Sequence, residues 1–174
     1  MMIKKLFVSG LCAVAVAMSV SSIGQAAEEG TEQPVIMKEE LANPFIEYTS
    51  MKELRKVAGF ITKSPHVLPE NFHKTYIAML RDKSFIEVQY VRSDEQKIVY
   101  KMAVKRWADR DISGDYTVYD WKQVVEVDNN EVTTRGNADG IHIAEWKDGE
   151  ASYSLSFSQG ISRKLIKEII ENIA

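Results

Sequence analysis

The spacing of apolar side chains changes along the chain, from a helix-like period before Phe72 to a period of two after it. Within residues 86–90, 98–104 and 153–157, every second residue is a large apolar or aromatic one. Successive side chains of a strand point to opposite faces, so this pattern is typical of strands with one buried face. The sequence therefore predicts a β-sheet beyond Phe72.

Short polar breaks separate these stretches. They are rich in Asp, Asn, Ser and Gly, and they are the segments 81–84, 128–130, 139–140 and 148–149. Such residues favour tight turns because they accept backbone conformations that most other residues avoid. Breaks this short join neighbouring antiparallel strands as hairpins. We therefore expect an antiparallel sheet of about six or seven strands.

Helical patterns lie on either side of the sheet segment. Ser50 and Glu53 have the spacing of a capping box, in which two side chains bond the first amides of a helix, and Gly59 is placed to end that helix. Ser162 can cap a second helix, whose apolar stripe consists of Leu165, Ile166, Ile169, Ile170 and Ile173. A sheet with one apolar face needs a cover. The predicted fold is α+β, an antiparallel sheet with an N-terminal and a C-terminal helix packed on it.

The first residues have the three-part layout of a secretory signal. Lys4 and Lys5 give a basic start, residues 6–20 are mostly apolar, and Gly24 and Ala26 are the small residues that a signal peptidase accepts before its cut. We expect cleavage after Ala26. The alternative is an uncleaved membrane anchor, but a stable span needs roughly 20 mostly apolar residues, and this run is shorter. The chain is predicted to be secreted, with no stable membrane span after cleavage.

The predicted domain organisation follows from this signal. Residues 1–26 are the signal peptide, residues 27–43 a polar, disordered linker, and residues 44–174 a single α+β extracytoplasmic domain. Cys12 is the only cysteine and lies inside the signal. The exported chain would then have no disulfide, no catalytic thiol and no zinc–thiolate site.

The net charge narrows the class of partner. Loss of Lys4 and Lys5 with the signal takes the formal charge from −3 to −5. An acidic domain without a cluster of Lys or Arg is a poor match for nucleic acid, so no nucleic-acid partner is expected.

The segment 109–120 has the sequence signature of a cation site. Asp109, Asp111, Ser113 and Asp120 lie at positions one, three, five and twelve of a loop with glycine at position six. This is the EF-hand spacing, in which oxygen ligands converge on calcium. Position twelve is normally glutamate, and an EF-hand loop joins two helices, whereas the flanks here are predicted strands. The alternative is a polar loop whose side chains bond nearby amides.

Aromatic residues supply a candidate binding surface. Tyr119 and Trp121 are the preferred pair for a peptide, sugar or lipid, although large aromatic side chains are more often part of a core. The sequence has no catalytic serine motif and no phosphate-binding glycine loop. We therefore predict no enzyme activity and no cofactor besides the calcium considered above.

Several segments together resemble a known family. They are Asn43-Pro44-Phe45, Gly59-Phe60, Leu68-Pro69-Glu70-Asn71-Phe72, Asp111-Ile112-Ser113-Gly114-Asp115-Tyr116, Gly136-Asn137, Trp146 and Tyr153-Ser154-Leu155-Ser156. The chain from about Asn43 resembles an uncharacterised extracytoplasmic domain family of Gram-positive bacteria. That family occurs in free-standing secreted proteins and as the outer, C-terminal domain of membrane proteins similar to anti-sigma factors. It usually has glycine where this chain has Asn71, and asparagine tolerates the same positive φ.

The resemblance implies an extracytoplasmic binding or sensing role and assigns no catalytic residue. We expect a non-enzymatic binding or regulatory module whose partner is a protein, peptide or glycan of the cell envelope. One alternative is an envelope hydrolase acting on wall sugars or peptides, which predicts a deep pocket holding acids with shifted pKa values. The other is a calcium-stabilised structural protein, which predicts that the oxygens of the 109–120 loop converge.

Overall fold

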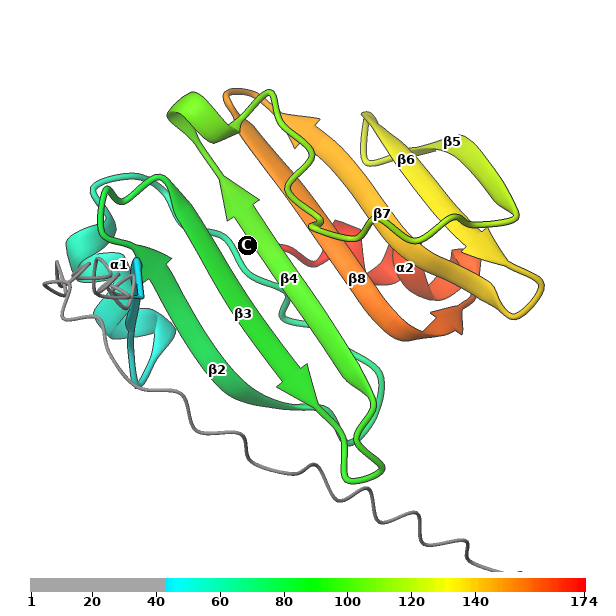
Figure 1. The fold of residues 1–174 in the computed structure, drawn as a ribbon, viewed down its shortest axis with the longest axis horizontal. Helices are drawn as coiled ribbons and strands as arrows, with labels where there is room; N and C mark the ends of the chain where they lie inside the picture. Colours follow the sequence, from blue (N-terminus) through cyan, green and yellow to red (C-terminus); the bar gives the residue numbers. More distant parts are fainter. Residues whose placement is uncertain (1–42) are drawn as a thin grey trace, which may run out of the picture. The chain divides into compact units, whose positions relative to one another are not determined.

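Residues 43–174 are described by a computed structural model, in which they form one eight-stranded antiparallel sheet with two α-helices (Figure 1). The strands are β1 (Phe45–Glu47), β2 (His73–Leu80), β3 (Phe85–Val91), β4 (Lys97–Ala103), β5 (Trp121–Val127), β6 (Asn130–Asn137), β7 (Gly140–Asp148) and β8 (Ala151–Ile161). The helices are α1 (Met51–Ala58) and α2 (Arg163–Glu171), and a single 3-10 turn, η1 (Lys105–Trp107), follows β4.

The order of the strands explains one long connection. Across the sheet they run β1-β2-β3-β4-β8-β7-β6-β5, and every neighbouring pair is antiparallel. The chain leaves β4 in the middle of the sheet and must reach β5 at its far edge. Residues 104–120, which we call the strap, make this crossing and run in front of β8 and β7 in Figure 1.

Helix α1 begins and ends where the sequence predicts. The Ser50 hydroxyl oxygen accepts a hydrogen bond from the Glu53 amide at 3.2 Å, and the Glu53 carboxylate bonds the Thr49 amide and hydroxyl. Gly59 ends the helix with φ at 77°, in the left-handed region that glycine adopts without strain. The predicted cap by Ser50 is confirmed, and the Glu53 carboxylate bonds Thr49, one residue before the expected Ser50 amide.

One face of the sheet is apolar and carries both helices. Buried residues of α1 and α2 belong to the same hydrophobic cluster as the alternating residues of the central strands, among them Leu54, Val88, Tyr100, Leu155, Ile166 and Ile169. Helix α1 contacts β2, and α2 contacts β7 and β5. Within residues 43–174, no helix has the length and hydropathy needed to cross a membrane.

The opposite face has only a small apolar cluster at one end. Phe85, Ala103 and Ile112 are its buried members, with half-buried Phe45, Leu80 and Trp107 packed around them. Ile112 belongs to the strap, so the first half of the strap is fixed partly by burial of this side chain.

The expected count of six or seven strands is wrong, because the described residues form eight. Strand β1 was missed because it has three residues, too few to show a period of two, and it lies where a linker was expected to end. It pairs with β2 from Phe45↔Leu80 to Glu47↔Ala78. The first helix is consequently preceded by a strand, and is not the first element of the domain. Asn71 does take a positive φ, 66°, as its place in the turn predicts.

Candidate functional site

Three strands of the polar face hold the strap. Lys101 Nζ on β4 donates to the Ser113 carbonyl oxygen at 2.7 Å, and the Ser152 hydroxyl on β8 donates to the Ala108 carbonyl oxygen. Lys147 Nζ on β7 lies 2.5 Å from the Asp109 carboxylate. The last of these pairs is exposed and contributes little, whereas Lys101 is mostly buried. The strap is thus bound mainly by polar contacts.

Arg135 on β6 is the centre of this polar network. Its guanidinium donates to the Ser113 hydroxyl and to the Glu145 carboxylate, both at 3.0 Å, and to the Asp115 carbonyl oxygen at 3.4 Å. It also lies 3.7 Å from the Asp111 carboxylate. The side chain is only 18% exposed. One cation therefore joins the strap to β6 and β7.

The two carboxyl groups beside Arg135 have pKa values shifted in opposite directions. Burial raises the pKa of Glu145 above its ordinary value, and a hydrogen bond with Asp111 adds to the rise. Burial also raises the pKa of Asp111, but hydrogen bonds from Ser113 and Glu145 and the charge of Arg135 together lower it below its ordinary value. When one proton is shared by the pair, it resides on Glu145.

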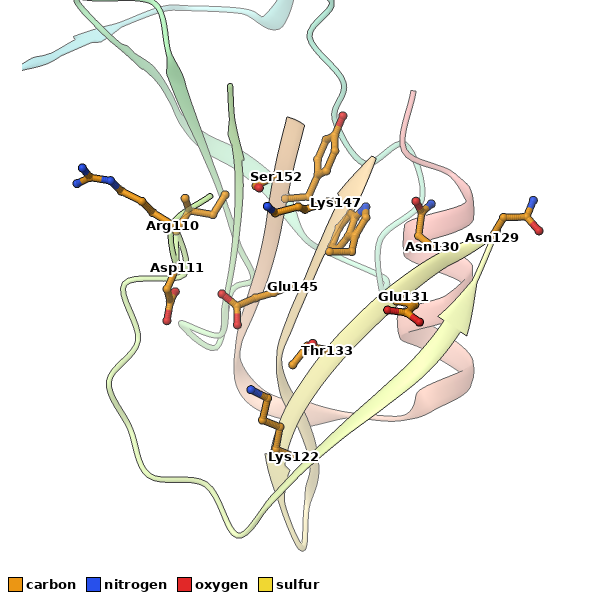
Figure 2. Close-up of a pocket in the computed structure, with 13 residues that line it drawn as sticks. Arg110, Asp111, Lys122, Asn129, Asn130, Glu131, Thr133, Glu145, Lys147 and Ser152 are labelled. Atoms are coloured by element: carbon orange, nitrogen blue, oxygen red, sulfur yellow. The ribbon is translucent and has the colours of Figure 1, made fainter. Parts of the chain in front are cut away.

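A groove of about 560 Å³ opens beside this network, between the strap, β6 and β7. Figure 2 shows Asp111 and Glu145 on one side of the groove, Asn130 and Glu131 at the tip of the β5–β6 hairpin on the other, and Lys122 at its lower end. The remaining lining residues are Arg110, Ile112, Asn129, Thr133, Trp146, Lys147, Ser152 and Tyr153. We call this space the β6–β7 groove.

Aromatic residues form part of its lining. The rings of Trp146 and Tyr153 stack with centroids 5.2 Å apart and an angle of 9° between their planes. Both side chains are almost fully buried and belong to the main hydrophobic cluster. The groove therefore combines a polar rim with a rigid apolar edge, the mixture common in ligand sites.

The structure brings together only part of the predicted calcium set. The Asp111 carboxylate accepts hydrogen bonds from the Ser113 amide and hydroxyl, at 2.9 and 2.6 Å. Asp109 is instead paired with Lys147, and the Asp120 amide donates to the Asn137 side chain at 3.1 Å. Among residues 43–174, no three His, Cys, Asp or Glu side chains form a group able to hold a metal ion. The calcium site stays a prediction.

Tyr119 and Trp121, the predicted binding pair, have separate surroundings. The Tyr119 ring stacks on His142 with centroids 5.5 Å apart, and its hydroxyl donates to Asp115 at 2.7 Å. Trp121 Nε1 donates to the Asn137 carbonyl oxygen at 3.0 Å. Neither residue lines the β6–β7 groove.

Gly136 explains how Trp121 lies against the sheet. A Cβ atom at position 136 would be 2.5 Å from the Trp121 ring and 2.1 Å from the Gly140 carbonyl oxygen. Gly136 and Trp121 are also direct cross-strand partners. The absence of a side chain at Gly136 thus leaves room for the Trp121 indole, which is half-buried within the fold.

The most connected residues of the site, Arg135 and Glu145, were not singled out from the sequence. Each is a charged residue within a predicted strand, which reads as an ordinary solvent-facing position. The available signal was that both lie at alternating positions facing away from the apolar side. The strap residues that contact Arg135 lie 20 or more residues before it along the chain, and the strap ends 25 residues before Glu145, so a local pattern cannot reveal this cover.

These features define a class of protein: a single-sheet α+β domain whose apolar face carries helices and whose polar face is crossed by a strap beside an open groove. The chain belongs to the family described as Domain of unknown function (DUF4367), whose model matches residues 62–173. Comparisons with curated proteins and with solved structures give no match. The matched residues include the strap and every residue that lines the β6–β7 groove.

Proposed function

We propose that the chain is a non-enzymatic binding or regulatory module of the cell envelope, with the β6–β7 groove as its ligand site. The observation that carries the proposal is the groove itself, whose volume of about 560 Å³ falls within the range of small-ligand sites. Its walls come from the strap, from β6 and from β7, which are held in place by Arg135. A preformed site binds without a large ordering cost.

The proposal is tested by filling the groove. Thr133 lies on its wall, so T133W introduces a bulky indole there, and K122E reverses the charge of an exposed side chain at its lower end. The matched control is I61W, which places the same indole at a side chain that is 81% exposed and outside the groove. Melting temperatures show whether each variant is folded.

The probes are a phage-displayed peptide library and purified cell-wall glycan fragments. We expect the purified protein to retain one of them, T133W and K122E each to weaken that binding by at least about tenfold, and I61W to leave it unchanged. The proposal is contradicted if neither probe binds, or if the folded variants and the control bind alike.

Export is part of the same proposal. The resemblance and the signal layout support cleavage after Ala26 and a role outside the membrane. The mass of the mature chain, measured on protein recovered from the culture medium and from the cell envelope, should correspond to a first residue of Ala27. An uncut chain confined to the cell pellet would contradict export.

The acid pair supports a second candidate, an envelope hydrolase. Two carboxyl groups with pKa values shifted apart are a common arrangement for acid–base chemistry. Against it, Arg135 lies 3.0 Å from Glu145, and so ties up the carboxyl that would serve as the acid. The candidate predicts that the protein releases soluble fragments from purified cell wall, that E145Q abolishes the release and that E131Q does not. No release from the unaltered protein would exclude it for that substrate.

A further inference from the structure

The ladder between β6 and β7 stops before either strand ends. Its last pair at this end is Thr133↔Glu145. Strand β6 nevertheless begins at Asn130, and β7 continues to Asp148. Three residues on each strand, 130–132 and 146–148, therefore have no ladder partner across the groove.

Each of these segments is held on its other side. Residues of β6 pair with β5 as far as Val127↔Asn130, and residues of β7 pair with β8 as far as Asp148↔Ala151. Both segments are consequently kept extended. Alternate residues of an antiparallel strand bond to opposite sides, so the backbone amides and carbonyls turned toward the groove are those of Glu131 on β6 and Lys147 on β7. Figure 2 shows the β5–β6 hairpin splayed away from β7 at this place.

Unpaired edges inside a sheet are rare, because an exposed row of N–H and C=O groups is a template for another strand. Three residues of strand span about 10 Å, which corresponds to a guest segment of three or four residues. A volume of about 560 Å³ accommodates a segment of that length. The groove thus offers main-chain partners as well as space.

The lining side chains fit a peptide main chain and short side chains. The amides of Asn129 and Asn130 and the hydroxyl of Thr133 can each donate and accept hydrogen bonds. The stacked Trp146 and Tyr153 give an apolar edge for one side chain of a guest. Glu145 and Asp111 form ion pairs with Arg135, so they present no free pair of charges to the guest peptide.

We propose that the β6–β7 groove binds an extended peptide segment as an added strand, paired to β7 at Lys147. This inference rests on the proposed binding function and narrows its ligand class. Strand β7 is the fixed partner because it is paired with β8 along its length, whereas β6 belongs to the edge hairpin and can adjust its distance. Main-chain pairing gives affinity, and the lining side chains select the guest.

The probe is a hexapeptide taken from the phage-displayed library with the purified protein. Its matched control is the same hexapeptide with alternate backbone nitrogens methylated, which keeps the side chains and removes the donors that a ladder needs. Binding by addition of a strand predicts that one of the two alternate methylation patterns weakens the affinity by at least about tenfold and that the other pattern has a much smaller effect. Backbone amide shifts of residues 146–148 and 130–132 should move on binding.

Other outcomes overturn the inference in distinguishable ways. Equal affinity for the peptide and both methylated forms means that the main chain is not recognised. Amide shifts confined to the outer edge of β5 mean that the peptide extends the sheet at that edge instead. If the protein retains only glycan fragments, and T133W no longer retains them, the peptide inference is contradicted and the proposed binding function is supported.

Discussion

The two faces of the sheet are covered by different means. On the helix face, α1 and α2 bury fully enclosed aliphatic side chains such as Leu54 and Ile169, so the cover is held by apolar area removed from water. On the other face the strap is held mainly by Arg135, Lys101 and Ser152. Polar contacts of this kind contribute little net stability, because water can replace them when the chain unfolds. The helix face therefore provides most of the stability.

The largest effect is expected on the helix face. Ile169 is fully buried, so I169A leaves a cavity and should lower the free energy of unfolding by about 2–5 kcal/mol. Its control is I61A, at a side chain that is 81% exposed, where a change below about 0.5 kcal/mol is expected. Urea denaturation measures both, and equal effects would break the contrast between the faces.

A smaller and more local effect is expected on the strap face. R135M removes the cation between Asp111 and Glu145 and should cost about 1–3 kcal/mol. Hydrogen exchange should accelerate in residues 104–120 more than in α1 or α2. The double variant R135M/E145L removes the unpaired carboxyl as well and should recover part of the loss. Uniform acceleration over the whole domain would contradict a strap held separately.

The pH dependence of stability sharpens the same comparison. Because burial raises the folded-state pKa of Glu145, the stabilisation linked to its proton is fully present below the ordinary value of 4.5 and is lost as pH rises through the higher folded value. E145Q stays neutral throughout. The unfolding free energy of the unaltered protein relative to E145Q should therefore fall as pH rises from 4 to 7. A constant or rising difference would contradict the raised pKa.

The smallest effect concerns calcium. Asp109 is paired with Lys147, and Asp111 with Ser113, so an ion would have to displace both contacts. We expect melting temperatures in millimolar calcium and in chelator to agree within about 1 °C. A rise of several degrees that D111A abolishes would establish the calcium site that the loop spacing predicts. It would contradict a strap held by these side-chain contacts alone.

The sequence predicted the local features of the fold well. The Ser50 cap, the hairpin turns and the positive φ of Asn71 each depend on a few neighbouring residues and are confirmed. Strand β1 was missed because three residues carry no period. The antiparallel class of the sheet was also correct, since short polar breaks leave few other connections.

The candidate site was much harder to predict. Tyr119 is predicted with Trp121 as a binding pair; in the structure it stacks on His142, outside the groove. The groove arises because β6 and β7 separate after Thr133↔Glu145, and nothing in either strand sequence marks that point. Contacts such as those of Arg135 with the strap depend on which strands become neighbours, and this is decided by the whole chain.

Hydrogen exchange with and without the selected hexapeptide tests the central claim most directly. A strand added in the groove should protect the groove-facing amides of Glu131 and Lys147 and, through Arg135, slow exchange in the strap, while α1 and α2 change little. Protection confined to the helices or to the outer edge of β5, with the groove segments unchanged, would contradict the assignment of the strap face as the binding face.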